Sequence, residues 1–75
     1  MTKLQVMQLI SETKNLYDTH VKVARERLQR DFKNMTAQQI MAENIFIQDM
    51  ESRSYALFLI LEEIDDIEEK EHNED

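Results

Sequence analysis

The chain has 75 residues, a formal net charge of −7, and no glycine, proline or cysteine. A chain of this length forms one small domain, and without cysteine it has no disulfide framework and no thiolate metal site. The lack of glycine excludes a glycine-rich phosphate-binding loop. Glycine and proline are the strongest breakers of regular structure, so their absence predicts an all-α chain with few loops.

The first predicted helix covers residues 2–33. Thr2 and Gln5 have the spacing of a capping box, in which the Thr hydroxyl accepts from the third amide and the Gln side chain reaches back. Lys14 lies in line with the apolar residues that follow, and its long side chain is expected to extend to water. Those apolar residues recur at intervals of three, four or seven, which is one face of a helix: Ile10, Tyr17, Val21, Ala24, Leu28, Phe32 and Met35.

A bend is predicted at residues 33–36 although no breaker is present. Thr36 and Gln39 form a second capping-box pattern, and Met35 and Ile40 are spaced for a hydrophobic staple around it. Asn34 is the residue best suited to a left-handed helix end in a chain without glycine. The alternative is one continuous helix, since these residues can stay helical at a modest cost in propensity.

The second predicted helix covers residues 36–67, and the two helices are expected to form an antiparallel hairpin. Residues whose numbers add up to roughly 70 then face each other, which places Ala24 opposite Phe46. Arg53 falls near Tyr17, where it either leaves the core at its edge or joins a polar layer that fixes the register. The predicted core residues of this helix are Phe46, Met50, Leu57, Leu61 and Ile64, with Ile60 beside them.

The negative charge is concentrated at the end of the chain. Residues 62–75 hold nine acids and one lysine, whereas residues 1–61 hold eight bases and seven acids. Because the helix macrodipole disfavours anions at a C-terminus, the helix is expected to fray after residue 67 and leave residues 68–75 as an acidic tail. Phosphate binding needs clustered positive charge, so we do not expect a nucleic acid as the main partner.

Both helices carry apolar residues that the hairpin core leaves outside. One row on the first helix recurs every seven residues, about 100° or more around the helix from the core row, and residues 55–61 are apolar on every side. Contiguous exposed apolar surface marks interaction sites, so we predict a protein-binding surface that takes a different helical protein or a second copy. The alternative is a single wide stripe between slightly rotated helices. The predicted partner-binding residues are Leu9, Leu16, Val23, Met41, Ile45, Tyr55, Phe58 and Leu59.

The candidate catalytic and metal-binding residues form no recognised pattern. The serines have no His–acid partner at the spacing of a catalytic triad, and His20 has no Cys or second His near it. Glu69 and His72 have the Glu-x-x-His spacing of helical di-iron sites, but those sites require two such motifs. We therefore expect no enzymatic activity, no catalytic residue, no metal and no cofactor.

The sequence also gives an expectation for location. Its first residues lack the basic and apolar regions of a secretory signal. The longest apolar run, residues 55–61, is far shorter than the roughly 20 residues that cross a bilayer. We expect a cytoplasmic protein without a membrane span.

Four segments carry a resemblance to a known family. They are Met1-Thr2-Lys3-Leu4, the end of the first helix at Leu28-Gln29-Arg30-Asp31-Phe32-Lys33, Gln38-Gln39, and Met50-Glu51-Ser52-Arg53-Ser54-Tyr55-Ala56 before an aliphatic run. The chain resembles the small E-type components of bacterial type III secretion systems, the YscE, PscE and EscE kind, but departs from them in its long acidic tail and in lacking glycine at the bend. The resemblance implies a co-chaperone without a cofactor. With a tetratricopeptide-like helical partner it would keep the needle subunit soluble in the cytosol.

Two other interpretations stay open. The first is a homodimeric hairpin that forms a four-helix bundle, as in Rop-like regulators, in which Lys22, Arg25, Arg30 and Lys33 form a basic face for RNA. The second is a phage or accessory protein that inhibits a host target through the same apolar stripes.

Overall fold

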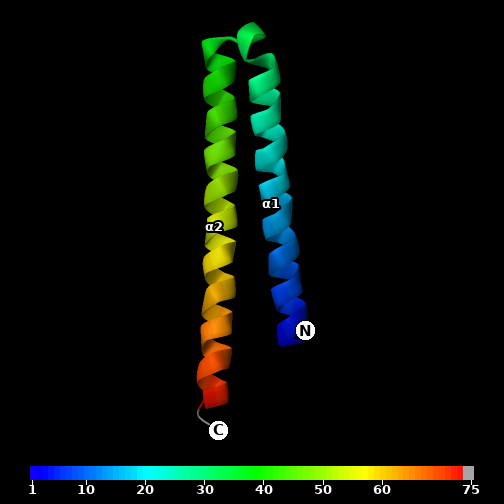
Figure 1. Ribbon diagram of the computed structural model, residues 1–75, viewed down its shortest axis with the longest axis vertical. Helices are drawn as coiled ribbons and strands as arrows, with labels where there is room; N and C mark the ends of the chain where they lie inside the picture. Colours follow the sequence, from blue (N-terminus) through cyan, green and yellow to red (C-terminus); the bar gives the residue numbers. More distant parts are fainter. Residues whose placement is uncertain (74–75) are drawn as a thin grey trace.

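The computed structural model describes the backbone of residues 1–73 and the side chains of residues 1–68. This part of the chain holds α1 (Lys3–Asp31), a one-turn 3₁₀ helix η1 (Phe32–Asn34) and α2 (Ala37–Asn73), so the predicted all-α class is confirmed. The chain forms two helices and not one continuous helix. Figure 1 shows α1 and α2 side by side, running in opposite directions and joined at one end by η1.

The molecule is long and thin. It measures 61 × 17 × 16 Å and has a radius of gyration of 17.4 Å, whereas a compact domain of this length has about 11 Å. Its accessible surface is 6229 Å², against about 4,900 Å² for a compact monomer of the same mass. The two helices therefore expose about 1,300 Å² more than a compact fold would.

Both predicted capping boxes are confirmed. At the start of α1, the Gln5 amide donates to Thr2 Oγ1 at 3.2 Å, and the Thr2 amide donates to Gln5 Oε1 at 2.9 Å. Before α2, the Gln39 amide donates to Thr36 Oγ1 at 3.1 Å, and the Thr36 amide donates to Gln39 Oε1 at 2.9 Å. Each box satisfies two amide groups that would otherwise have no helical acceptor.

The bend is made without a left-handed residue. No described residue has a positive φ angle, so the prediction of a left-handed Asn34 is wrong. Instead α1 tightens into η1, whose turn lets the Met35 amide donate to the Phe32 carbonyl at 3.2 Å. Met35 is then extended, with φ −94° and ψ 143°, and reverses the chain. Because the α-helix already ends at Asp31, Phe32 is exposed and not part of the predicted core row.

The two helices meet along a seam of residues that recur in steps of three and four, the spacing of a coiled coil. Among the described side chains, three ion pairs cross between the helices: Lys3 to Glu68 at 3.4 Å, Arg27 to Glu43 at 3.5 Å, and Arg25 to Glu51. The residue numbers of the first two pairs add up to 71 and 70, close to the predicted register, and those of the third add up to 76. The seam residues, all buried or half-buried, are Met7, Ile10, Lys14, Tyr17, Val21, Ala24 and Leu28 on α1, and Ile40, Glu43, Ile47, Met50, Ser54, Leu57, Leu61 and Ile64 on α2.

On α2 the predicted core residues Met50, Leu57, Leu61 and Ile64 lie in the seam, and the prediction is wrong only at one edge of it. Ile47 is 6% exposed and belongs to the core, whereas Phe46 is 38% exposed. Ser54 is buried in the place expected for Arg53, and Ile60 is exposed. At positions 46, 53 and 60 the next residue along the chain lies in the seam instead, about 100° around the helix. This brings Ser54 into contact with α1 and leaves the Phe46 ring at the edge of the seam.

α2 continues to Asn73, beyond the predicted end at residue 67. Glutamate and lysine are good helix formers, and here their propensity outweighs the unfavourable interaction of acids with the helix C-terminus. The last two residues of the predicted tail, 74–75, and the side chains after Glu68 lie outside the described part of the chain.

Candidate protein-binding surface

The exposed apolar residues outnumber the buried ones. Among the described side chains, the only buried hydrophobic residues are Ala24, Ile47 and Met50. The eight predicted partner-binding residues are all exposed, from 41% for Phe58 and Leu59 to 62% for Met41 and Tyr55. The other large hydrophobic residues that are exposed are Met1, Leu4, Phe32, Phe46, Ile60 and Ile67.

A first apolar face lies along one side of the seam. Leu9, Leu16 and Val23 are one heptad apart, about 130° around α1 from the centre of the seam. His20 neighbours Leu16 and Val23 on the helix surface, and its ring meets the Phe46 ring edge-on at 6.5 Å. Phe46 therefore lies on the same side. We define the first apolar face as Leu9, Leu16, Val23, Phe46 and Ile60.

Phe46 and Ile60 were expected in the core, so the sequence did not predict their part in this face. They lie two heptads apart on α2, with Arg53 midway between them. The Arg53 guanidinium lies 5.9 Å from the centre of the Tyr17 ring and 3.3 Å from Asp49 Oδ2. Arg53 thus leaves the core at its edge and stacks on Tyr17, the first of its two predicted outcomes.

A second apolar face lies on the outer side of α2. We define it as Met41, Ile45, Tyr55, Phe58 and Leu59, which are all exposed. The Tyr55 and Phe58 rings are stacked, with centroids 6.4 Å apart and planes 29° apart. Met41 and Ile45 line an open hollow of about 460 Å³ further along the helix.

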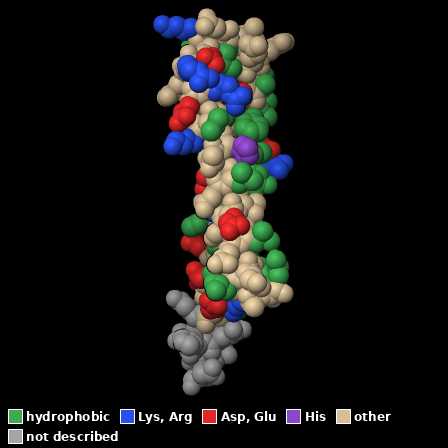
Figure 2. Space-filling model, turned by 90° about the vertical axis from the view of Figure 1, so that its right-hand side faces the viewer, with side chains coloured by type: hydrophobic (Ala, Val, Ile, Leu, Met, Phe, Trp, Pro, Cys, Tyr) green, Lys and Arg blue, Asp and Glu red, His purple; other side chains and the backbone are tan. Residues whose placement is uncertain are grey.

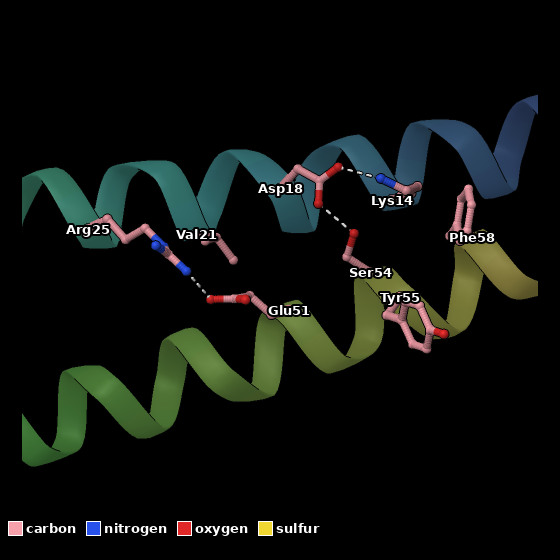
Figure 3. A pocket seen from close by; sticks show the side chains of 8 residues that line it. All are labelled: Lys14, Asp18, Val21, Arg25, Glu51, Ser54, Tyr55 and Phe58. Carbon is pink, nitrogen blue, oxygen red and sulfur yellow. Dashed lines mark hydrogen bonds and ion pairs between the residues drawn. The ribbon is translucent and has the colours of Figure 1, made fainter.

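An open groove of about 500 Å³ lies between α1 and α2 beside the second apolar face. Figure 3 shows that Asp18 lies between Lys14 and Ser54 within it. Lys14 Nζ donates to Asp18 Oδ2 at 2.7 Å, and the Ser54 hydroxyl donates to Asp18 Oδ1 at 2.5 Å. The groove is lined by Lys14, Asp18, Val21, Arg25, Glu51, Ser54, Tyr55 and Phe58.

These hydrogen bonds make the polar layer of the seam. The bond from Lys14, followed by the bond from Ser54, lowers the pKa of Asp18 below its usual value, because both donors favour the charged carboxylate. A polar layer is therefore present in the seam. It is formed by Ser54 and Asp18, and not by Arg53 as the second predicted outcome had it. Asp18 and Ser54 join the two helices at this level, and Ser54 is buried.

Basic side chains gather near the bend, and many of them pair with acids. Arg25 pairs with Glu51 across the helices. Arg30 pairs with Asp31, with 3.2 Å between Nε and Oδ1. Figure 2 views the molecule from the α1 side and shows Lys and Arg side chains toward the bend, with hydrophobic side chains in separate groups along the length. Two of the four bases of the predicted RNA face are thus already engaged with carboxylates.

The described residues hold no group of His, Cys, Asp and Glu side chains arranged for a metal ion. The Glu69 and His72 side chains lie outside this description. Neither helix, over the residues searched, combines the length and hydropathy that crossing a membrane requires.

No family model, curated protein or solved structure matches the chain. The resemblance to E-type secretion components therefore stays a prediction, and the geometry of the surface carries the functional argument.

Proposed function

We propose that the chain is a non-enzymatic protein-binding module that completes a helical bundle with a protein partner. In this proposal it acts as a cytoplasmic co-chaperone of the E type, which with a tetratricopeptide-like partner keeps a secretion needle subunit soluble. The observation that carries the proposal is the excess of exposed over buried large hydrophobic residues in a chain whose helices are regular and capped.

The amount of exposed surface fits this role. The helix pair exposes about 1,300 Å² more than a compact monomer of its mass, and a standard interface buries about 800 Å² on each partner. Grouped exposed apolar side chains, such as the stacked Tyr55 and Phe58, mark interaction sites. Covering one face with a partner brings the chain close to the exposure of an ordinary compact domain.

The second apolar face indicates what kind of partner suits it. It combines aliphatic, aromatic and methionine side chains on one helix, a surface that a groove between partner helices can receive. Exposed acids border it, with Glu51 on one side and Glu62 and Asp65 toward the end of α2. The partner is therefore expected to offer an apolar helical groove with lysine or arginine at its rim.

The proposal is tested by site-specific photocrosslinking in the native host. A photoreactive phenylalanine analogue replaces Leu59 in one variant, and Ser52 in a matched variant. Both positions are on α2 and one heptad apart, so they lie in one line on the same outer surface, and both are exposed. We expect one strong protein adduct from position 59 and a weaker adduct from position 52. Purified adducts are identified by mass spectrometry.

A helical-repeat protein captured at position 59 supports the co-chaperone proposal. Equal labelling of many proteins from both positions contradicts the proposal, because a specific site distinguishes the apolar residue from its polar neighbour. An adduct to RNA contradicts it as well and favours the Rop-like interpretation.

A further inference from the structure

We propose that the first apolar face binds a second copy of this chain in antiparallel orientation, while the second apolar face stays open to a protein partner. This inference depends on the proposed function only in stating that a protein partner binds the second apolar face. The dimer itself is argued from the spacing of apolar residues, the placement of charge and the exposed area.

The row on α1 suits a two-fold axis. Leu9, Leu16 and Val23 are evenly spaced at seven residues, about 10.5 Å apart along the helix. An axis through Leu16, perpendicular to the helix, places Leu16 against Leu16 of the second copy and Leu9 against Val23 of the second copy. Such an interface is isologous, because both copies use the same surface. If Leu9 of one copy contacts Val23 of the other, Val23 of the first copy contacts Leu9 of the second.

Charge selects the antiparallel orientation. Arg27 and Arg30 lie beyond Val23 toward the bend, and their side chains stay 49% and 72% exposed beside their own partners Glu43 and Asp31. Residues 62–68 at the other end of the molecule carry five acids and no base. Arg30 and Thr2 are equally far from Leu16 in opposite directions along α1, so the two-fold axis places Arg30 of one copy near Thr2 of the other. Thr2 is next to Lys3, whose ion pair with Glu68 shows that this end of α1 lies beside the acidic turns of α2. The antiparallel dimer therefore brings Arg30 of each copy to the acidic end of the other, and a parallel dimer sets like charges together.

The chain as a whole exposes enough surface for such an interface. It draws apolar residues from both helices, with Phe46 and Ile60 of α2 flanking the row on α1. Packing two such faces together makes four helices around one apolar layer, the arrangement of a four-helix bundle. The excess surface of about 1,300 Å² per chain exceeds the roughly 800 Å² per partner that a stable interface takes.

The two faces are separate, so both can be occupied at once. Leu16 lies on α1 on one side of the seam, whereas Leu59 and Tyr55 lie on the outer side of α2. A dimer through the first face leaves two copies of the second face exposed. The assembled protein then presents two equivalent partner sites.

The experiment measures the mass of the full chain in solution by sedimentation equilibrium. We expect twice the chain mass of 9.0 kDa for the wild type and for Leu59→Glu, and the chain mass for Leu16→Glu. Both variants place a carboxylate at an exposed leucine, but only Leu16→Glu sets two carboxylates against each other on the two-fold axis. We expect dissociation to increase by about a hundredfold or more in Leu16→Glu, with unchanged helicity by circular dichroism.

Salt tests the orientation. The antiparallel dimer is expected to weaken as ionic strength rises, because its end contacts pair opposite charges, and Arg30→Glu is expected to weaken it about tenfold. Strengthening with salt overturns the antiparallel arrangement. A monomeric wild type, or loss of the dimer in Leu59→Glu alone, overturns the assignment of the first face.

The photocrosslinking experiment keeps the two proposals apart. In a Leu16→Glu background, position 59 is expected to capture the same protein as before. Loss of that adduct in a helical monomer overturns the independence of the two faces. If the wild type is monomeric but still captures a partner at position 59, the dimer proposal is wrong and the proposed function is still supported.

Discussion

The half of the molecule near the bend and the open half at the chain ends are built differently. Of the side chains that the structure describes, the three buried hydrophobic ones, Ala24, Ile47 and Met50, all lie in the bend half. Past the polar layer, the seam of the open half is made of half-buried residues such as Leu57 and Leu61. The same turns of α2 carry the aromatic and aliphatic residues exposed on its outer side.

The difference indicates where the chain is stable by itself and where it depends on a partner. Two cross-helix ion pairs, Arg25–Glu51 and Arg27–Glu43, reinforce the bend half. Burial of apolar surface stabilises it more, by about 25 cal/mol per Å², because exposed ion pairs contribute little. The bend half therefore holds the two helices together, and the open half offers the surface that remains to be covered.

The largest expected effect comes from removing side-chain volume in the bend half. Ile47→Ala should lower the free energy of unfolding by about 2–4 kcal/mol, because it removes buried methyl groups and leaves a cavity. Phe46→Ala, its neighbour, should cost about 1 kcal/mol, because the ring is partly exposed. Urea unfolding followed by circular dichroism, at concentrations where the chain is monomeric, measures both. A larger loss from Phe46→Ala than from Ile47→Ala would support the predicted core position of Phe46 and contradict its observed place at the edge of the seam.

A matching deletion in the open half should cost less. Leu61→Ala removes a half-buried side chain whose surroundings relax into solvent, so we expect a loss of about 1–2 kcal/mol. The same urea unfolding experiment compares it with Ile47→Ala. Equal losses at the two positions would mean that the two halves contribute alike to the fold.

The contrast between the helices also explains how far the sequence predicts this molecule. On α1 the core row through Ile10, Tyr17 and Ala24 alternates steps of three and four, so periodicity identifies it. The apolar residues directly before them, Leu9, Leu16 and Val23, recur only every seven residues. On α2 apolar residues occupy neighbouring positions, as at residues 45–47, and hydrophobicity does not choose between them.

The choice on α2 depends on contacts between residues far apart in the chain. Ser54 donates to Asp18, and Glu43 pairs with Arg27. The periodicity of one helix does not predict either of these contacts, because each joins residues of both helices. The exposed surface was easier to predict. Residues far from the seam are exposed whichever of two adjacent residues occupies the seam. Leu9, Leu16 and Leu59 are of this kind. Phe46 and Ile60 lie at the edge of the seam, and the residues that follow them, Ile47 and Leu61, take the core positions.

The two capping boxes give a smaller and well-matched comparison. Thr36→Ala at the bend should lower the free energy of unfolding by about 1 kcal/mol, within the usual range for a lost N-cap. Thr2→Ala makes the same chemical change at the open end, where the first turn of α1 can fray with little further loss. We expect less than about 0.5 kcal/mol there. A larger effect at Thr2 would show that the open end is held as firmly as the bend.

The smallest expected effect is a pH dependence at the polar layer that divides the two halves. Because the folded-state pKa of Asp18 is lowered, its ionised form adds stability above the unfolded pKa of about 3.9. That contribution is lost as the pH falls through the lower folded-state pKa. The stability difference between the wild type and Asp18→Asn should therefore be constant above about pH 5 and shrink below pH 4.

Ser54→Ala separates the hydrogen bond from the general acidity of the chain. It leaves every carboxylate in place but removes one of the two donors that lower the pKa of Asp18, so it should reduce the acid-dependent loss without abolishing it. Thermal unfolding of the three proteins between pH 3 and pH 6 measures the difference, since carboxylates titrate in about that range. If Asp18→Asn and the wild type lose stability in parallel throughout, Asp18 is no better stabilised in the folded chain than in the unfolded one. The polar layer would then set which α2 residues face α1 without adding to stability.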